Sequence, residues 1–157
     1  MEVKRLNIDR SEIEKLVRSI IMEEYSNQIN DSSKRHVDSS GIMSISLPLF
    51  SVSEEDRLDT GDPNHKVYTK DLVSLAESPR LGCGLMVMED TTFDWTLGYD
   101  EIDYIIEGTL TIIIDGRRIT ANAGELILIP SGSRIQFSVE GKARFIYVTY
   151  PADWQHK

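Results

Sequence analysis

The sequence lacks most of the features that would place a chain in a specialised class of protein. Cysteine occurs once in 157 residues, at Cys83, so no internal disulfide can form and a disulfide-stapled secreted scaffold is excluded. No apolar run approaches the ~20 residues of a membrane-spanning helix, and the first residues contain no apolar signal core. We therefore expect a cytoplasmic protein with no membrane partner.

Basic residues are also scarce, because 17 Lys and Arg stand against 26 Asp and Glu, for a net charge of −9. Binding to nucleic acids or to anionic membranes draws on clustered positive charge, so we expect no nucleic-acid partner. The chain is 40% hydrophobic and 27% charged, as is typical of a soluble domain. Its length suits one domain that buries a core without metal or disulfide.

Residues 9–25 carry the pattern of an amphipathic helix. Ser11 to Glu14 match a capping box. Apolar residues then recur at the i, i+3, i+4 spacing of one helix face: Ile13, Leu16, Val17, Ile20 and Ile21. Residues 26–41 are polar and predict a flexible tether. Such a short helix is marginal alone, so it docks either on its own domain or dimer mate, or on a foreign partner.

From residue 42 the pattern changes to short strands, which predicts two parts: helix plus tether at 1–41, and a β domain at 42–157. Turn residues separate the predicted strands at spacings of about ten residues. These strands are 81–88, 93–97, 102–106, 110–114, 118–121, 126–129, 135–139 and 145–150. Asp115-Gly116 suits a two-residue type I′ hairpin. We predict an all-β fold, a double-sheet β barrel preceded by the short helix.

Residues 112–114 of one strand and all of strand 126–129 are apolar at every position. An antiparallel sheet with one face in water alternates apolar and polar residues instead. We therefore expect a second subunit to cover the outer face, which makes the protein a homodimer.

Two stretches resemble the signature motifs of the cupin superfamily. The first is Tyr104 to Leu110, and the second, Gly124 to Gly132, has the order Gly, five residues, Pro, any residue, Gly. The resemblance implies a small antiparallel barrel that holds a metal through three His and a Glu. Glu101 takes the glutamate position, but strand 93–97 has no histidine and the third histidine position is Ile135. We therefore expect no tightly bound transition metal.

A longer stretch, from about residue 53 to 154, is similar to the EutQ family of ethanolamine-utilisation proteins. Its most specific part is residues 93–104, Phe-Asp-Trp-Thr-Leu-Gly-Tyr-Asp-Glu-Ile-Asp-Tyr. The resemblance implies acetate kinase activity with Mg²⁺ and ATP, and location in a bacterial microcompartment. It also favours a shell or cargo protein as the partner of the N-terminal helix. The alternative is a non-catalytic assembly or targeting module. The chain has no Walker A loop, so ATP binding rests on the resemblance alone.

Glu101 and Asp103 are the predicted catalytic residues. They lie two apart on a strand, so both face one side, about 6.6 Å apart along the chain. Inside the barrel the pair would either raise the pKa of one carboxyl group or hold a cation such as hydrated Mg²⁺.

Five more residues are predicted to bind a ligand in the barrel cavity: Asp94, Trp95, Tyr99, Tyr104 and Arg134. The register of strand 93–97 stays open, since either Asp94 and Thr96 or Trp95 and Leu97 face inward. Arg134 follows the Pro-x-Gly turn and would neutralise phosphate charge. Trp154 is expected to pack on the outside of the barrel.

Overall fold

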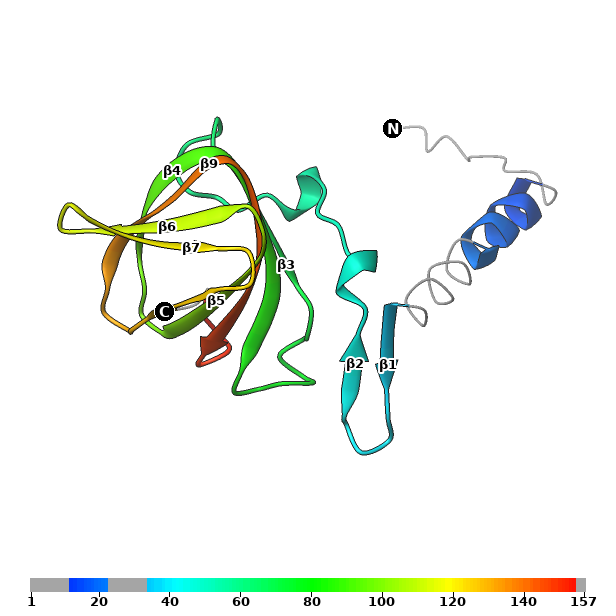
Figure 1. The fold of residues 1–157 in the computed structure, drawn as a ribbon. Helices are drawn as coiled ribbons and strands as arrows, with labels where there is room; N and C mark the ends of the chain where they lie inside the picture. The colour runs from blue at the N-terminus through cyan, green and yellow to red at the C-terminus, as the bar shows by residue number, and fades with distance from the viewer. Residues whose placement is uncertain (1–11, 23–33, 155–157) are drawn as a thin grey trace, which may run out of the picture. The chain divides into compact units, whose positions relative to one another are not determined.

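The computed structural model describes residues 12–22 and 34–154, in two compact units that divide after Phe50 (Figure 1). In the first unit, residues 12–22 are helical, within the range that the apolar spacing predicts. The predicted helix ends, 9–11 and 23–25, lie outside the described residues. No helix in the described ranges is both long enough and apolar enough to cross a membrane.

The first unit also contains a β-hairpin whose first strand the sequence pattern did not predict. It is formed by β1 (Arg35–Val37) and β2 (Met43–Ile45), and the 3₁₀ helix η1 (Leu47–Leu49) follows it. The polar stretch expected to be a tether therefore contains a strand, and the boundary expected after Gly41 falls inside the hairpin turn. Residues 26–33 of that stretch lie outside the described residues.

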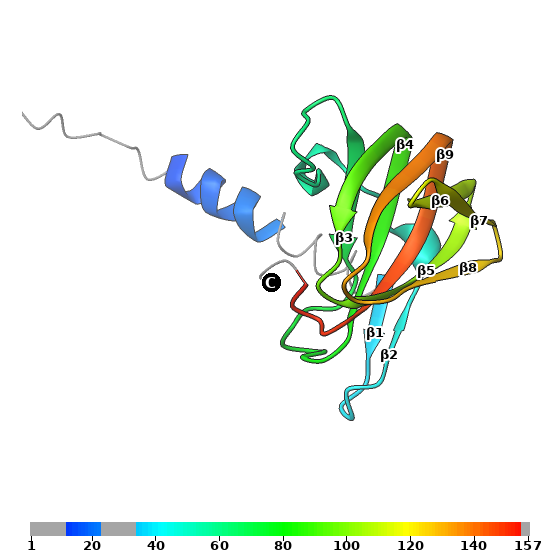
Figure 2. The same ribbon diagram turned by 90° about the vertical axis from the view of Figure 1, so that its left-hand side faces the viewer.

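The second unit is a β barrel built from seven strands. After the 3₁₀ helix η2 (Glu54–Asp56) these are β3 (Lys66–Asp71), β4 (Gly82–Thr96), β5 (Asp100–Glu107), β6 (Thr109–Ile114), β7 (Arg117–Asn122), β8 (Leu126–Ile129) and β9 (Arg134–Tyr150). The order across the sheet is β3-β4-β9-β5-β8, and β6 pairs with both β9 and β7. Figure 2 shows β4 and β9 running side by side and curving around the interior. The predicted all-β barrel is confirmed.

The long strands β4 and β9 each merge two predicted strands. In β4 the register shifts between Glu89 and Thr91, where Asp90 adopts a φ of 39°. The Oδ1 of Asp90 accepts a hydrogen bond of 2.6 Å from the Gly141 backbone N–H on β9. The turn-like residues therefore mark a bulge inside continuous strands rather than a break between strands.

The predicted hairpin at Asp115-Gly116 is confirmed. Both residues have positive φ, 48° and 76°, and Ile114 pairs with Arg117 across the turn. These are the dihedral signs that a type I′ turn requires.

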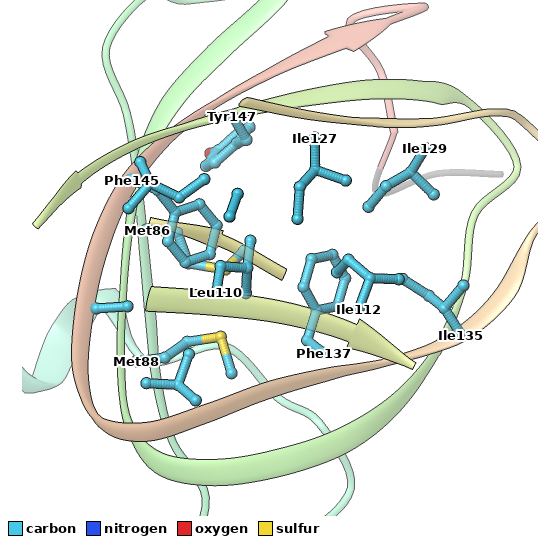
Figure 3. Close-up of a cluster of buried hydrophobic side chains, with 14 of the residues drawn as sticks. Met86, Met88, Leu110, Ile112, Ile127, Ile129, Ile135, Phe137, Phe145 and Tyr147 are labelled. Carbon is cyan, nitrogen blue, oxygen red and sulfur yellow. The ribbon is translucent and has the colours of Figure 1, made fainter. Parts of the chain in front are cut away.

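Apolar side chains fill the interior of the barrel (Figure 3). They come from all seven strands and include Met86, Met88, Leu110, Ile112, Ile127, Ile129, Ile135, Phe137, Phe145 and Tyr147. Phe93 stacks on Phe137 with ring centroids 5.4 Å apart. Burying one large apolar side chain contributes about 1.5–3 kcal/mol, whereas an uncompensated buried charge is costly. Any carboxyl group among these side chains therefore needs an explanation.

Candidate functional site

Strand β5 directs two carboxyl groups into this apolar interior. Burial alternates along the strand, so that Glu101, Asp103 and Ile105 face inward while Ile102 and Tyr104 face outward. Glu101 is 4% exposed and Asp103 is 0% exposed. The structure thus brings the two predicted catalytic residues together inside the barrel.

The two carboxyl groups have few partners in the described part of the chain. Glu101 Oε1 and both Asp103 oxygens are buried without a hydrogen-bond donor. Burial raises the pKa of Glu101 to about 8, although its contact with Asp103 acts to lower it. Burial and the neighbouring Glu101 also raise the pKa of Asp103 well above its usual range. At neutral pH the pair therefore holds at least one proton, which can bridge the two groups.

An open pocket of about 1060 Å³ lies at one end of the barrel. Four of the five predicted ligand-binding residues line it, namely Asp94, Trp95, Tyr99 and Arg134. The loop 55–59, the Asp115-Gly116 turn and Trp154 complete its wall. The loop and Trp154 were not predicted to belong to the site.

The structure resolves the register of strand 93–97. Trp95 packs against the core and Leu97 is fully buried, whereas Asp94 and Thr96 are exposed. Asp94 nevertheless borders the pocket, where its Oδ1 accepts a hydrogen bond of 3.0 Å from Gln136 Nε2 on the neighbouring strand.

Trp95, Tyr99 and Trp154 form an aromatic floor beneath the pocket. Trp95 Nε1 donates a 2.8 Å hydrogen bond to Tyr99 Oη, and the Trp154 ring centroid lies 6.3 Å from that of Trp95 and 5.8 Å from that of Tyr99. The same three residues line a void of about 10 Å³, which Glu101 also lines. The aromatic floor therefore separates Glu101 from the open pocket. The prediction that Trp154 packs on the outside of the barrel is wrong.

Two arginines face the pocket and differ in their partners. Arg57 is held by Glu54 at 2.7 Å and donates a 2.7 Å hydrogen bond to the His65 carbonyl oxygen. Arg134 is exposed and forms no ion pair with any residue in the ranges that the structure describes. Arg134 is thus available to bind an anionic group.

Tyr104 does not belong to this pocket. Its side chain is 45% exposed and lies on the opposite face of β5 from Glu101 and Asp103. Successive side chains of a strand point to opposite faces, so residue 104 faces outward when 101 and 103 face inward. The prediction that Tyr104 binds a ligand in the cavity is therefore wrong.

The positions that would carry the histidines of a cupin metal site carry apolar side chains. Trp95, Leu97 and Ile135 are packed in or against the core, and of the four ligand positions Glu101 alone supplies a ligand atom. Across residues 12–22 and 34–154, no three His, Cys, Asp or Glu side chains are grouped so as to hold a metal ion.

Comparison with known proteins identifies the family. The family model for ethanolamine utilisation protein EutQ matches residues 8–156. The chain belongs to the EutQ family.

Two curated EutQ relatives carry the name acetate kinase EutQ. The protein of Clostridioides difficile (strain 630) is 65% identical over 149 residues, which cover 94% of this chain and 95% of that protein. The protein of Escherichia coli (strain K12) is 40% identical over 99 residues, 63% of this chain but only 42% of that longer relative.

Solved structures agree with the family and the fold. The Clostridium difficile EutQ structure has a TM-score of 0.75 and 71% identity, and covers 76% of this chain and 88% of that chain. A cupin superfamily protein from Desulfitobacterium hafniense is 16% identical with a TM-score of 0.51, over 66% of this chain and 84% of its own. The barrel of this EutQ-family chain therefore has the cupin fold.

The EutQ-family barrel also contains a hydrogen bond between Tyr147 and Asp71 that was not predicted from the sequence. Tyr147 Oη on β9 donates a 2.7 Å hydrogen bond to Asp71 Oδ1 on β3. The two residues are 76 positions apart, and no local pattern connects them.

Proposed function

We propose that this EutQ-family chain is an acetate kinase, which interconverts ATP plus acetate with acetyl phosphate plus ADP. Its 65% identical relative carries that name and is matched over 95% of its length. The observation that carries the proposal is the open pocket of about 1060 Å³ with Arg134 in its wall. Ligand pockets of this size bind molecules as large as a nucleotide.

Phosphoryl transfer depends mainly on positioning and on neutralising charge. The Arg134 guanidinium, which has no ion pair within the described part of the chain, binds phosphate oxygens. The indoles of Trp95 and Trp154 offer apolar faces on which a base can stack. Asp94 at the pocket rim would help to hold the Mg²⁺ that accompanies ATP, and the ion would neutralise phosphate charge. Asp103 is fully buried, so a hydrated Mg²⁺ does not fit beside it, contrary to one expectation from the sequence.

Glu101 contributes through its neutral form. A protonated Glu101 donates a hydrogen bond to the carboxylate of acetate, whereas an ionised one would repel it. Asp103 shares the proton and keeps the pair from carrying two negative charges. The void beside Glu101, about 10 Å³, is too small for acetate, so Trp154 moves aside when acetate binds. No transition metal takes part, which elemental analysis of the purified protein checks.

Acetyl phosphate formation by the purified full-length chain, with acetate and Mg-ATP, tests the proposal. We expect Arg134→Gln to raise the KM for ATP about tenfold, because a charged hydrogen bond is lost. We expect Glu101→Leu, which removes the hydrogen-bond donor to acetate, to lower kcat about 100-fold. Arg80→Gln, an exposed arginine outside the pocket, is the matched control and should behave as the unaltered chain does. No activity above background, or equal activity with and without Glu101, would overturn the proposal.

A targeting role for the first unit is a second candidate function. Six apolar side chains of the helix are between 46% and 66% exposed: Ile13, Leu16, Val17, Ile20, Ile21 and Met22. An apolar helix face of this kind binds in a groove of a partner protein. We propose that the partner is a shell or cargo protein of a bacterial microcompartment in which the chain resides.

Replacing Leu16 and Ile20 with Glu should release the tagged full-length chain from microcompartments in cells that assemble them. Charges in the apolar face prevent its burial in a groove, and the tagged protein should become diffuse. Ser19→Glu, on the polar face of the same helix, should leave localisation unchanged. Unchanged localisation of the Leu16 and Ile20 variant would exclude this role for the helix.

We also propose that the chain is a homodimer through the outer face of β5 and β8. Ile102 pairs with Leu128 and Tyr104 with Leu126, and these four side chains are 40% to 61% exposed. Of the other strand expected to be covered on both faces, Ile112 is buried and Ile113 and Ile114 are half-buried. A contiguous exposed apolar patch typically marks an interface.

Replacing Leu126 and Leu128 with Glu should convert the dimer to a monomer. Two charges in each copy of the face would be buried without partners, which costs several kcal/mol. Sedimentation equilibrium of the full-length protein measures the change in mass. Leu81→Glu is the control, since Leu81 is 53% exposed and lies on neither strand. A monomeric unaltered chain, or a variant that stays dimeric, would contradict this interface.

A further inference from the structure

Glu101 is closed off from the open pocket by the aromatic floor, yet it has to take up a proton to reach the neutral form in which we propose that it acts. We propose that Tyr147 and Asp71 form a proton pathway between Glu101 and a second, smaller opening on the barrel surface. The use made of the proton rests on the proposed function, but the pathway itself does not depend on it.

The first observation is the unusual course of the Tyr147 side chain. On β9, Tyr147 pairs with Asp103 of β5 on one side and with Gly84 of β4 on the other. A Cβ atom on Gly84 would lie 2.1 Å from both Cζ and Oη of Tyr147. The phenol ring therefore crosses β4 directly over Gly84. Its hydroxyl reaches β3, where it donates the 2.7 Å hydrogen bond to Asp71 Oδ1.

The outer end of the pathway opens to solvent away from the large pocket. Asp71 is exposed and lines a surface pocket of about 60 Å³. Trp154 lines this small pocket, the large pocket and the inner void, and so lies between them. Protons can therefore reach Asp71 while a ligand occupies the large pocket.

The inner end is the void beneath the aromatic floor. Both Glu101 and Tyr147 line it, together with Tyr99. Its volume, about 10 Å³, is close to the minimum that a single water molecule needs. We infer that a water there bonds to the Glu101 carboxyl group and to the phenol hydroxyl of Tyr147, since both residues line the void. Glu101 Oε1 has no other partner in the described part of the chain, which favours such a bridge.

The proton moves by a relay of three transfers. The Glu101 carboxyl group gives its proton to the water, the water passes one to Tyr147 Oη, and Tyr147 passes its own hydroxyl proton to Asp71 Oδ1. The water and the phenol end unchanged, Glu101 has lost one proton, and Asp71 has gained one that it releases to solvent. Proton uptake follows the reverse order.

The other titratable groups around the pathway are neutral or acidic. Asp103 adjoins Glu101, and Asp153 lines the small pocket beside Asp71. Burial raises the pKa of Tyr99, and burial with the hydrogen bond to Asp71 raises the pKa of Tyr147, so both phenols stay protonated. Burial and Asp71 raise the pKa of Cys83. These surroundings keep the relay hydroxyls in their neutral form.

Time-resolved infrared spectroscopy after a pH jump tests the pathway on the full-length protein. The signal is the C=O stretch of protonated Glu101, identified by its loss in Glu101→Gln. Tyr147→Phe keeps the ring but removes the relay hydroxyl, and should slow protonation at least about tenfold, or about 1.4 kcal/mol of barrier. Asp71→Asn keeps an acceptor for Tyr147 but cannot carry the proton, and should slow it similarly.

Tyr104→Phe is the matched control, because it removes a phenol hydroxyl from the outer face of β5, and it should protonate at the original rate. If Tyr147→Phe does not fold, the Asp71→Asn variant decides the outcome. Two results would overturn the pathway: Glu101 protonation in the pathway variants at the rate of the unaltered chain, or no infrared band of protonated Glu101 at neutral pH. The readout uses no substrate, so slowed protonation without acetyl phosphate formation would overturn only the proposed function.

Discussion

Replacing Glu101 with Gln should abolish most of the fall in stability that the unaltered protein shows as the pH rises from about 5 to 8. The folded-state pKa of Glu101 is raised to about 8 from an ordinary value of 4.5. Between these values the unfolded chain releases a proton that the folded chain keeps, so the free energy of unfolding falls with rising pH. Each pH unit costs about 1.4 kcal/mol, for a total on the order of 4 kcal/mol. Above pH 8 the loss is complete.

Urea unfolding at pH 5 and pH 8 measures this difference. Asp103 contributes in the same direction, since its pKa is also raised. The Glu101→Gln variant should therefore keep a smaller dependence of the free energy of unfolding on pH. Glu140→Gln is the matched control, because the Glu140 side chain is 93% exposed and its removal should leave the slope intact. Equal pH dependence in the Glu101→Gln variant and the unaltered chain would show that Glu101 ionises normally in the fold.

Gly84→Ala should destabilise the protein by about 3 kcal/mol, which is the largest effect we expect from a single methyl group. The new Cβ would collide with the Tyr147 ring, and overpacking of this kind costs about 1–3 kcal/mol. Displacing the ring also breaks the hydrogen bond to Asp71, which adds about 1 kcal/mol. The ring and strand β4 are both enclosed, so neither relaxes easily.

A double-mutant cycle with Tyr147→Leu isolates this contact. Leucine leaves the space above Gly84 open, so Gly84→Ala should cost less than about 1 kcal/mol in the Tyr147→Leu background. Denaturant unfolding of the two single variants and the double variant provides the measurement. Additive losses would mean that the cost of Gly84→Ala does not come from Tyr147.

Local patterns in the sequence were sufficient for the barrel and for part of the site. Turn dipeptides and apolar alternation predicted the strands, and the spacing of Glu101 and Asp103 placed both on one face. The same alternation also excluded Tyr104 from that face, so the sequence contained the information needed to avoid this error. The sequence predicted breaks within β4 and β9, where the structure has a bulge. A polar pair such as Glu89-Asp90 occurs both in turns and in bulges, so the pattern did not distinguish the two.

The rest of the site depends on contacts between residues distant in sequence. Strand 93–97 alternates apolar residues with Asp94 and Thr96, and a polar cavity or an apolar core would each select a different face. Its register was therefore settled only by packing on Phe137 and its neighbours. Trp154 lies after the last strand, and nothing near it in sequence shows that it closes the barrel. The contact of Tyr147 with Asp71 requires the order β3-β4-β9, which a single sequence does not reveal.

The protonation state of Glu101 underlies both the proposed chemistry and the proton pathway. A ¹³C NMR titration of glutamate side-chain carboxyl groups, with the Glu101 signal assigned by its loss in Glu101→Gln, measures that state directly. We predict a midpoint for Glu101 of about 8. A midpoint close to the ordinary value of 4.5 would show an ionised carboxylate inside the barrel at neutral pH and would contradict both.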